Sequence, residues 1–493
     1  MFEMILPPGG RLFSMVLAAF LVSWILADPL PAQEVAQEAV PENMQESAEE
    51  GLGSGFLSEA VEVSQHSANL IFGNEEEFDQ ALVFMRDRGK ADVIPSLILA
   101  VRYRYDREEA LNKVMTELTG HNAEGWFEWM LWQEAHPELR PHPSYVGIKT
   151  RVLLALDEEF IRFVNPEISQ PEQMDIRLEE VTWGGVAVDG IPSLDNPDLI
   201  EAAEADYMFD SDLVFGVEIN GDARAYPLRI MGWHEMFNET IGGVPVALAY
   251  CTLCGAGILF ETEVEGFDAP LVFGSSGLLY RSNKLMFDRT TNSLWNQFTG
   301  EPVSGYLRKS GIKLKVRPVA ITSWKAWKEV HPDTKVLSID TGFIRDYGSG
   351  VVYQDYFGSA DLMFPTNADE GLLRQKDHVF GIRDVGLSKA WPMDAFRGGK
   401  VINDEIGGRS LVLIGDAETH TVRAYERSAD QTFTATDKEA HLDGHGGIWT
   451  ISETEIRGPN GESLPRLPGH VAYWFAWNGY FGGDSELYAA VTE

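Results

Sequence analysis

Cysteine is almost missing from this sequence, because its 493 residues contain only two. A scaffold held together by many disulfides is therefore excluded. Basic residues are also few, with 39 Lys and Arg against 76 Asp and Glu and a formal net charge of −37. A chain this acidic repels phosphate backbones, so we expect no nucleic-acid partner. No glycine-rich phosphate-binding loop occurs either, so we expect no nucleotide cofactor.

Only one long hydrophobic run is present, at residues 12–27. Arg11 precedes it, and the small residues Ala27 and Ala32 offer cleavage points, so the pattern predicts a secretory signal peptide over residues 1–32. The alternative is an uncleaved anchor, although the run is shorter than the about 20 residues that span a bilayer. We therefore expect an exported protein, periplasmic or extracellular, that is held at a membrane only if this segment is retained.

Two further segments precede the first predicted strands. Residues 33–72 are rich in Gln, Glu, Ala, Ser and Gly, a composition that predicts an acidic disordered linker. Residues 73–165 show helical periodicity that is interrupted by glycine and proline. Short helices separated by tight turns are typical of HEAT repeats, so we predict a small HEAT-like helical module that could bind a protein partner.

Beyond residue 180 the pattern changes to short apolar or alternating runs with Gly and Asn-Gly turns, which predicts β-strands. This part resembles itself, because Asp212-Leu-Val-Phe-Gly-Val matches Asp377-His-Val-Phe-Gly-Ile and further matches follow at the same offset. The sequence therefore predicts an α+β fold, with the helical module followed by an internally duplicated β-rich domain. The two pseudo-symmetric copies would span residues 180–345 and 365–493 and pair with each other.

Residues that occur in only one copy are better candidates for chemistry than residues that both copies share. Both cysteines are such residues, and they form Cys251-Thr-Leu-Cys254-Gly between two apolar runs, which places them at the tip of a predicted hairpin. The first copy and the second differ at four positions of this kind: His234 against Gly399, Glu235 against Lys400, Cys251 against Asp416 and Cys254 against Thr419.

A CxxCG turn at a hairpin tip is similar to a metal knuckle. Cys251, Cys254 and His234 are therefore predicted ligands of a transition metal (zinc, copper or iron), with the fourth position of a zinc site left open or filled by another side chain. Two alternatives stay open at this point. The cysteines could form a disulfide in an oxidising compartment, or they could be two inert buried thiols.

Further candidate residues surround this motif in the sequence. Glu235 follows His234 directly and could act as a base or as the partner of the histidine. The polar stretch 274–297 contributes Tyr280 and Asp288. We predict Glu235, Tyr280 and Asp288 as catalytic residues that line a pocket.

The Trp233-His234-Glu235 and Cys251-Thr-Leu-Cys254-Gly motifs, in this order, resemble the bacterial domain of unknown function 3179 family over about residues 180–490. Members usually carry Cys-Pro-x-Cys-Gly, so this chain lacks the proline of the turn. The resemblance implies an exported or envelope protein and brings no established reaction. Two hypotheses follow: a metal-binding, redox-active envelope protein, or a non-enzymatic binding or scaffold module with a structural Cys251–Cys254 disulfide.

Overall fold

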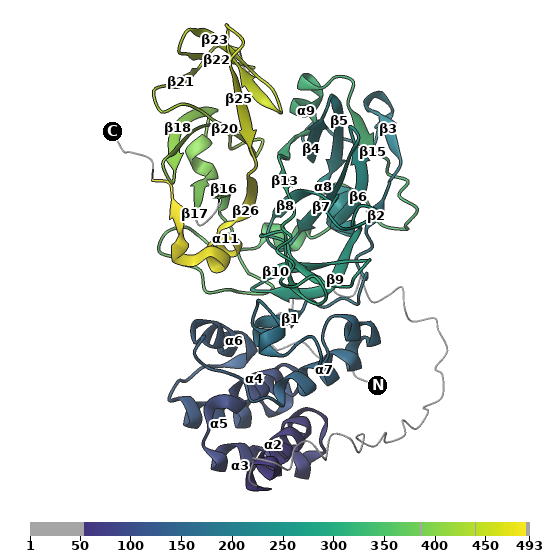
Figure 1. The fold of residues 1–493 in the computed structure, drawn as a ribbon, viewed down its shortest axis with the longest axis vertical. Helices are drawn as coiled ribbons and strands as arrows, with labels where there is room; N and C mark the ends of the chain where they lie inside the picture. The colour runs from purple at the N-terminus through teal and green to yellow at the C-terminus, as the bar shows by residue number, and fades with distance from the viewer. Residues whose placement is uncertain (1–53, 385–386, 439, 490–493) are drawn as a thin grey trace. The chain divides into compact units, whose positions relative to one another are not determined.

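The computed structural model describes residues 54–384, 387–438 and 440–489 (Figure 1). Helices come first and a β-rich part follows, as predicted. The predicted signal peptide and residues 33–53 of the predicted linker lie outside the described residues. The helices of the first part are α2 (Ser54–Phe72), α3 (Glu75–Arg88), α4 (Ile94–Tyr103), α5 (Glu108–Thr119), α6 (Gly125–Ala135) and α7 (Tyr145–Leu156).

Residues 54–72, which we expect to be linker, form helix α2 instead. Val63 and Leu70 lie seven positions apart on one face of this helix, and both are fully buried. The helix packs on α3 and α4, so this apolar face is covered. Burial of a few apolar side chains is enough to order a segment whose composition is otherwise typical of disorder.

Local signals explain where the predicted helices begin and end. Asn74 and Glu77 form a reciprocal capping box at the start of α3, and Gly89 ends this helix in the left-handed conformation, at φ 66°. Gly120 ends α5 in the same way, at φ 72°. The helices predicted within residues 73–165 are therefore present, whereas their likeness to HEAT repeats stays a prediction. Among the described residues, no helix has both the length and the hydropathy needed to cross a bilayer.

Within the described residues the chain forms two compact units, one of residues 54–130 and 137–148 and one of residues 131–136 and 149–489. The second unit contains all the strands. Its strands up to residue 337 form the first β region: β1 (Val181–Trp183), β2 (Leu194–Asp195), β3 (Leu199–Glu201), β4 (Leu213–Ile219), β5 (Asp222–Pro227), β6 (Met236–Ile241), β7 (Val244–Cys251), β8 (Ala256–Glu261), β9 (Phe273–Tyr280), β10 (Asn283–Asp288), β11 (Leu294–Asn296), β12 (Glu301–Ser304), β13 (Val316–Arg317), β14 (Ala320–Ser323) and β15 (Lys335–Leu337).

The strands from residue 378 onward form the second β region: β16 (His378–Asp384), β17 (Leu387–Pro392), β18 (Lys400–Ile406), β19 (Arg409–Asp416), β20 (Thr421–Glu426), β21 (Phe433–Ala435), β22 (His441–Gly444), β23 (Gly447–Ile451), β24 (Glu455–Arg457), β25 (Ser463–Leu467), β26 (His470–Tyr473) and β27 (Ser485–Leu487). Four short helices accompany the strands of this unit: α8 (Leu228–His234), α9 (Trp324–Val330), α10 (Gln354–Gly358) and α11 (Trp474–Phe481).

The two β regions share a strand order. One sheet of the first region runs β14-β4-β5-β15-β3, and the corresponding sheet of the second runs β26-β16-β17-β27. In each region the first hairpin is followed by an antiparallel three-stranded run, β6-β7-β8 in one and β18-β19-β20 in the other. In both sheets a glycine lies under a tryptophan ring, so that an added Cβ would come within 2.4 Å of Trp327 at Gly216 and within 2.1 Å of Trp477 at Gly381.

The two β regions bury a common hydrophobic core. Phe215 and Leu248 of the first region belong to the same buried cluster as Phe380 and Leu413 of the second. The apolar faces that each region would expose alone therefore cover each other.

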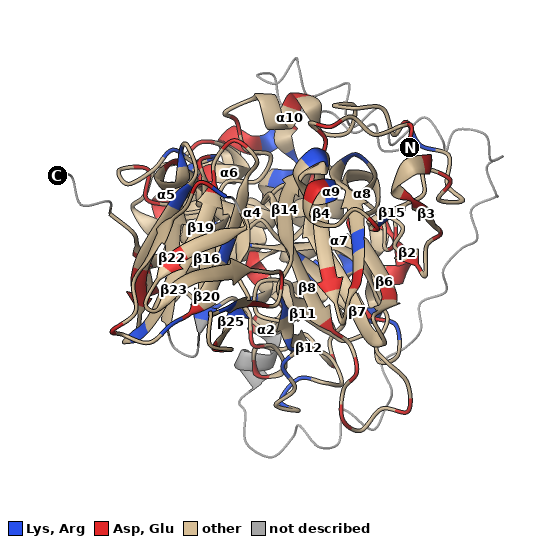
Figure 2. Ribbon diagram, turned by 90° about the horizontal axis from the view of Figure 1, so that it is seen from above, with Lys and Arg blue, Asp and Glu red and all other residues tan. Residues whose placement is uncertain are grey.

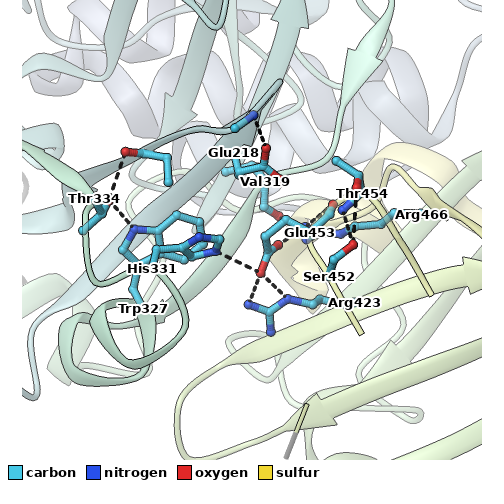
Figure 3. Close-up of polar contacts among 12 residues, drawn as sticks. Glu218, Val319, Trp327, His331, Thr334, Arg423, Ser452, Glu453, Thr454 and Arg466 are labelled. Atoms are coloured by element: carbon cyan, nitrogen blue, oxygen red, sulfur yellow. Dashed lines mark hydrogen bonds and ion pairs between the residues drawn. The ribbon is translucent and has the colours of Figure 1, made fainter. Parts of the chain in front are cut away.

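A buried carboxylate also joins the two β regions (Figure 3). Glu453 is paired with Arg423 and Arg466 of the second region, and Arg466 also donates to the carbonyl of Val319 in the first. His331 Nε2 of the first region lies 3.9 Å from Glu453 Oε1. Although burial acts in the opposite direction, Arg423 and Arg466 hold the pKa of Glu453 well below its ordinary value.

The excess of acidic residues is not confined to one element. Figure 2 shows Asp and Glu on many helices, strands and loops, with Lys and Arg scattered among them. Several of these acids are buried in ion pairs, as Glu453 is, so part of the negative charge is internal.

Candidate functional site

The two cysteines lie at a strand–turn–strand connection, as predicted. Strand β7 ends at Cys251 and β8 begins at Ala256, and the turn between them is closed by backbone hydrogen bonds from Cys254 to Cys251 and from Gly255 to Thr252. We call residues 251–256 the thiol turn. Gly255 adopts φ 61°, and an added Cβ would lie 3.2 Å from the ring of Tyr473. The left-handed backbone and the close contact with Tyr473 both favour a glycine at this position.

The two sulfurs of the thiol turn are buried next to each other. Cys251 Sγ and Cys254 Sγ are 2.7 Å apart, and their residues are 2% and 0% exposed. Cys254 Sγ also lies 3.2 Å from the Ser282 carbonyl, to which a thiol donates, and 3.6 Å from Asn283 Nδ2. Burial raises the pKa of Cys254 well above its ordinary value, and Cys251 adds to this effect. Cys254 is therefore held as a neutral thiol rather than as a reactive thiolate.

A strained hairpin tip faces these sulfurs. Residues 280–283 connect β9 to β10, and the two central residues, Arg281 and Ser282, have φ values of 46° and 61°. A two-residue turn of this type usually contains Asn or Gly, because other residues are strained at positive φ. The strain is retained here while the Ser282 carbonyl and the Asn283 amide lie against Cys254.

Amides from the same region connect the hairpin tip to the strands that flank the thiol turn. Asn283 Nδ2 donates to Gln297 Oε1 at 2.7 Å. Gln297 Nε2 in turn donates to the carbonyls of Ala249 and Ala256, at 2.7 and 2.8 Å. Gln297 thus holds β7 and β8 together directly beside the cysteines.

A buried ion pair adjoins the thiol turn. Glu235 accepts from Lys284 Nζ at 3.0 Å and from Thr252 Oγ1 at 2.6 Å. Glu235 and Lys284 are 7% and 3% exposed. Glu235 also ends α8 at φ 54°, and its carbonyl accepts the Tyr250 amide. The predicted base is therefore beside the cysteines, but both of its carboxylate oxygens already have partners.

Three tyrosines surround the thiol turn. Tyr356 donates its hydroxyl to the Leu253 carbonyl at 2.8 Å, and the Tyr473 amide donates to the Cys254 carbonyl at 2.8 Å. Tyr353 packs against the buried cluster that contains both cysteines. Burial raises the pKa of Tyr353 and Tyr356 above the ordinary value and that of Tyr473 to about 12. All three rings therefore stay protonated, as neutral donors.

His234 is engaged elsewhere. Its Nδ1 lies 2.9 Å from the Pro192 carbonyl and its Nε2 lies 2.6 Å from the Tyr347 hydroxyl, which also bonds to Thr341. Burial lowers the pKa of His234 to about 4, so the ring is neutral. Both ring nitrogens thus have protein partners, and among the described residues no group of three or more His, Cys, Asp or Glu side chains is arranged to hold a metal ion. The structure does not bring His234 and the two thiols together as a ligand set.

Asp288 holds a turn. It is fully buried, and it accepts from the Thr291 amide at 2.6 Å, the Thr291 hydroxyl at 2.7 Å and the Trp295 indole at 2.9 Å. These bonds fix the connection from β10 to β11, so the carboxylate has the partners of a structural residue.

Tyr280 lies at the base of the hairpin tip, next to Arg281. Its ring contacts Tyr480 edge to face, with centroids 6.2 Å apart. Burial raises the pKa of Tyr280 above its ordinary value, and the charge of Glu180 adds to this effect. Of the three predicted catalytic residues, Glu235 is the one whose contacts reach the thiol turn.

Comparison with known protein families gives a match that covers more than half of the chain. The family described as "Protein of unknown function (DUF3179)" matches residues 188–484. The chain belongs to this family. The matched region runs from β2 to β26 and contains the thiol turn, the hairpin tip, α10 and Tyr473. No curated protein matches the chain, and no solved structure matches it.

Proposed function

We propose that Cys251 and Cys254 form a dithiol–disulfide couple, and that the disulfide fixes the turn on which α10 and β26 pack. The observation that carries this proposal is the 2.7 Å separation of the two sulfurs. Both cysteines are free thiols in the structure, and this distance is longer than an S–S bond of about 2.05 Å, so the sulfurs have to approach each other by less than 1 Å to form the bond. In this view the chain is an exported binding or scaffold protein with a structural disulfide rather than an enzyme with a metal centre.

A small disulfide oxidises the two thiols. The two thiols lose two electrons and two protons, the Sγ–Sγ bond forms, and the oxidant leaves as two thiols. The thiols and the disulfide are both neutral, so neither state buries a charge beside Glu235 and Lys284. Because the folded chain covers both sulfurs, the exchange takes place during folding, before the tyrosines close over the turn.

The contacts around the turn support a structural role. Tyr356 and Tyr473 bond to the carbonyls of Leu253 and Cys254, which lie in the short loop that the Cys251–Cys254 disulfide would close. A nucleophilic cysteine needs an exposed, electropositive surrounding that lowers its pKa. Cys254 has the opposite surrounding, since it is fully buried and its pKa is raised.

The internal duplication is part of the same proposal. The shared strand order supports it, as do the two glycine–tryptophan contacts. The turns support it as well, because Gly242 and Gly243 have φ values of 54° and 82° while Gly407 and Gly408 have 56° and 80°. In a duplicated scaffold, the cysteines are a feature that one copy gained or the other lost.

The redox state and the metal content of the purified protein test the proposal together. The protein is expressed with export to the periplasm, purified without a chelator or a histidine tag, and unfolded in the presence of N-ethylmaleimide. We expect an intact mass two protons below the reduced form, no maleimide label and no stoichiometric metal. Two maleimide labels without metal would show that the cysteines are inert thiols. Two labels together with about one zinc, copper or iron per chain, which is lost in Cys251→Ser, would show a metal site. Either result contradicts the proposal.

A further inference from the structure

Arg383, on β16 of the second β region, is a partly buried cation without an acidic partner. Among the described residues no carboxylate lies within 4 Å of its guanidinium; Glu301, the acid whose charge reaches it, is paired with Lys313 at 2.9 Å. Arg383 Nη2 donates to the Thr299 carbonyl at 3.1 Å. Arg383 Nη1 is buried and has no hydrogen-bond partner. An arginine stays charged when buried, so this arrangement calls for an acceptor.

A second unused donor lies beside this arginine. Asn296 Oδ1 accepts the Thr299 amide, which fixes Asn296 Nδ2 as a donor, and this donates to the Tyr480 hydroxyl at 2.5 Å. Tyr480 therefore accepts a hydrogen bond and must give its own proton to another group. No acceptor for that proton is found among the described residues. Burial raises the pKa of Tyr480 to about 12, so the hydroxyl keeps its proton.

A third polar atom without a partner comes from His470 on β26. His470 is 8% exposed, and its Nε2 has no hydrogen-bond partner. Burial, together with the charge of Arg383, lowers the pKa of His470 to about 3. Phe298 contacts the rings of both His470 and Tyr480, with centroid distances of 5.5 and 5.2 Å. Arg383 donates to the carbonyl of the next residue, Thr299, and its charge acts on both His470 and Tyr480, so the three groups are neighbours around residues 298 and 299.

We propose that Arg383, Tyr480 and His470 bind a small oxyanion, a carboxylate or a phosphate. The guanidinium and the phenol can only donate here, and a neutral imidazole can donate from Nε2, so the group complementary to all three is a compact acceptor of negative charge. A metal ion is excluded as the ligand because the charge of Arg383 repels it.

All three donors belong to the second β region and have no counterpart in the first. The positions that correspond to Arg383, His470 and Tyr480 in the first β region are Glu218, Ala320 and Val330. The same sheet therefore forms without these side chains, so the fold does not require them. The inference is also independent of the proposed disulfide, since neither cysteine contributes to the oxyanion site.

Thermal unfolding with phosphate, acetate or chloride at equal ionic strength tests the site. The protein is kept reduced with dithiothreitol, so that the state of the thiols is constant. We expect the melting temperature to rise by about 3 °C and to saturate with phosphate or acetate, relative to chloride. Phosphate also stabilises proteins nonspecifically, but that effect does not saturate and is the same in every variant.

Variants of the donors separate specific binding from this background. Arg383→Met keeps an unbranched apolar stem but removes the guanidinium, and should lose the saturable rise. Tyr480→Phe, which keeps the ring, should weaken the apparent affinity at least tenfold. The matched control is Arg397→Met, because Arg397 is exposed and paired with Asp394. An equal rise in Arg383→Met and in the unmodified chain would overturn the proposal, as would the absence of a saturable effect with either oxyanion.

Discussion

The same hairpin turn occurs in both β regions, with different chemistry. In the first region β7 ends at Cys251, and in the second β19 ends at Asp416. The residue with positive φ is Gly255 in one turn, at 61°, and His420 in the other, at 56°. In the second turn Asp416 accepts the Glu418 amide at 2.8 Å, as in an ordinary surface turn. The fold therefore does not need the cysteines, and their burial is a property of the first region alone.

Other polar features are common to both regions and belong to the scaffold. In the first region Glu239 is bonded to Arg224 and Tyr226; in the second, Asp404 is bonded to Lys389 at 3.1 Å and to the Trp391 indole at 2.7 Å. Asn238 and Asn403 likewise each exchange two hydrogen bonds with the backbone of a phenylalanine, Phe273 in the first region and Phe433 in the second.

The Glu235–Lys284 pair is absent from the second region, where the residue that corresponds to Glu235 is the exposed Lys400. The features that set the first region apart are thus gathered around the thiol turn, and variants that affect one region alone test this comparison.

The largest expected effect is on the buried ion pair. Lys284→Met leaves Glu235 buried without its counter-charge and should lower the free energy of unfolding by about 3 kcal/mol. The matched variant in the second region, Lys400→Met, changes an exposed lysine and should stay within about 0.5 kcal/mol. Urea unfolding of both variants measures the difference. Equal losses of stability would contradict the claim that the buried ion pair stabilises the fold.

The two turns should also respond differently to a change at the residue with positive φ. Gly255→Ala forces a Cβ into the left-handed conformation and toward Tyr473, and should cost about 2 kcal/mol. His420→Ala in the second turn replaces a residue that already carries a Cβ and removes only its ring contact with His378, so it should cost less than about 1 kcal/mol. Melting temperatures of the two variants provide the comparison; a larger loss in His420→Ala would contradict the close packing of the thiol turn.

Oxidation should stabilise one region only. Closing the short loop between Cys251 and Cys254 restricts the unfolded chain and should raise the free energy of unfolding by on the order of 1–2 kcal/mol. The measurement is urea unfolding with and without dithiothreitol. The Cys251→Ser/Cys254→Ser double variant should show no dependence on the reductant, and any residual dependence in it would point to a cause other than this disulfide.

The contact between the two regions predicts the smallest effect, a dependence on pH. Because folding lowers the pKa of Glu453 below its ordinary value of 4.5, the carboxylate stabilises the folded chain above that pH. This stabilisation is lost as the pH falls through the folded-state pKa. Between pH 5 and pH 3 we expect Glu453→Gln to lose about 1 kcal/mol less stability than the unmodified chain. Parallel curves of stability against pH would contradict the assignment.

The sequence predicts the scaffold better than the site. Alternating apolar runs and the CxxCG position between them correctly place Cys251 and Cys254 at a strand–turn–strand tip. The partners of the site were missed because they lie in the stretch between the two predicted copies, residues 346–364. In this stretch, whose only helix has five residues, the Tyr347 hydroxyl is bonded to His234 Nε2, and Tyr353 and Tyr356 cover the thiol turn. The signal that was present is the density of aromatic residues in an otherwise loop-like stretch.

Lys284 was missed for a related reason. It lies within the strand Asn283–Asp288, where every residue is buried. A strand that is buried on both faces lacks the alternation of apolar and polar residues, so the pattern does not show that the lysine is buried. Its partner Glu235 is 49 positions away in the sequence, and such a pairing follows from topology rather than from local pattern.

Hydrogen exchange of the oxidised and reduced protein tests the central claim most directly, because it reports on both turns in the same sample. If the cysteines form a disulfide that fixes the packing of the first region, oxidation should slow the exchange of amides in residues 251–256, in α10 and at Tyr473. The second turn, residues 416–421, should be unchanged. Equal protection of residues 251–256 in both redox states, or slowing in both turns alike, would contradict the account.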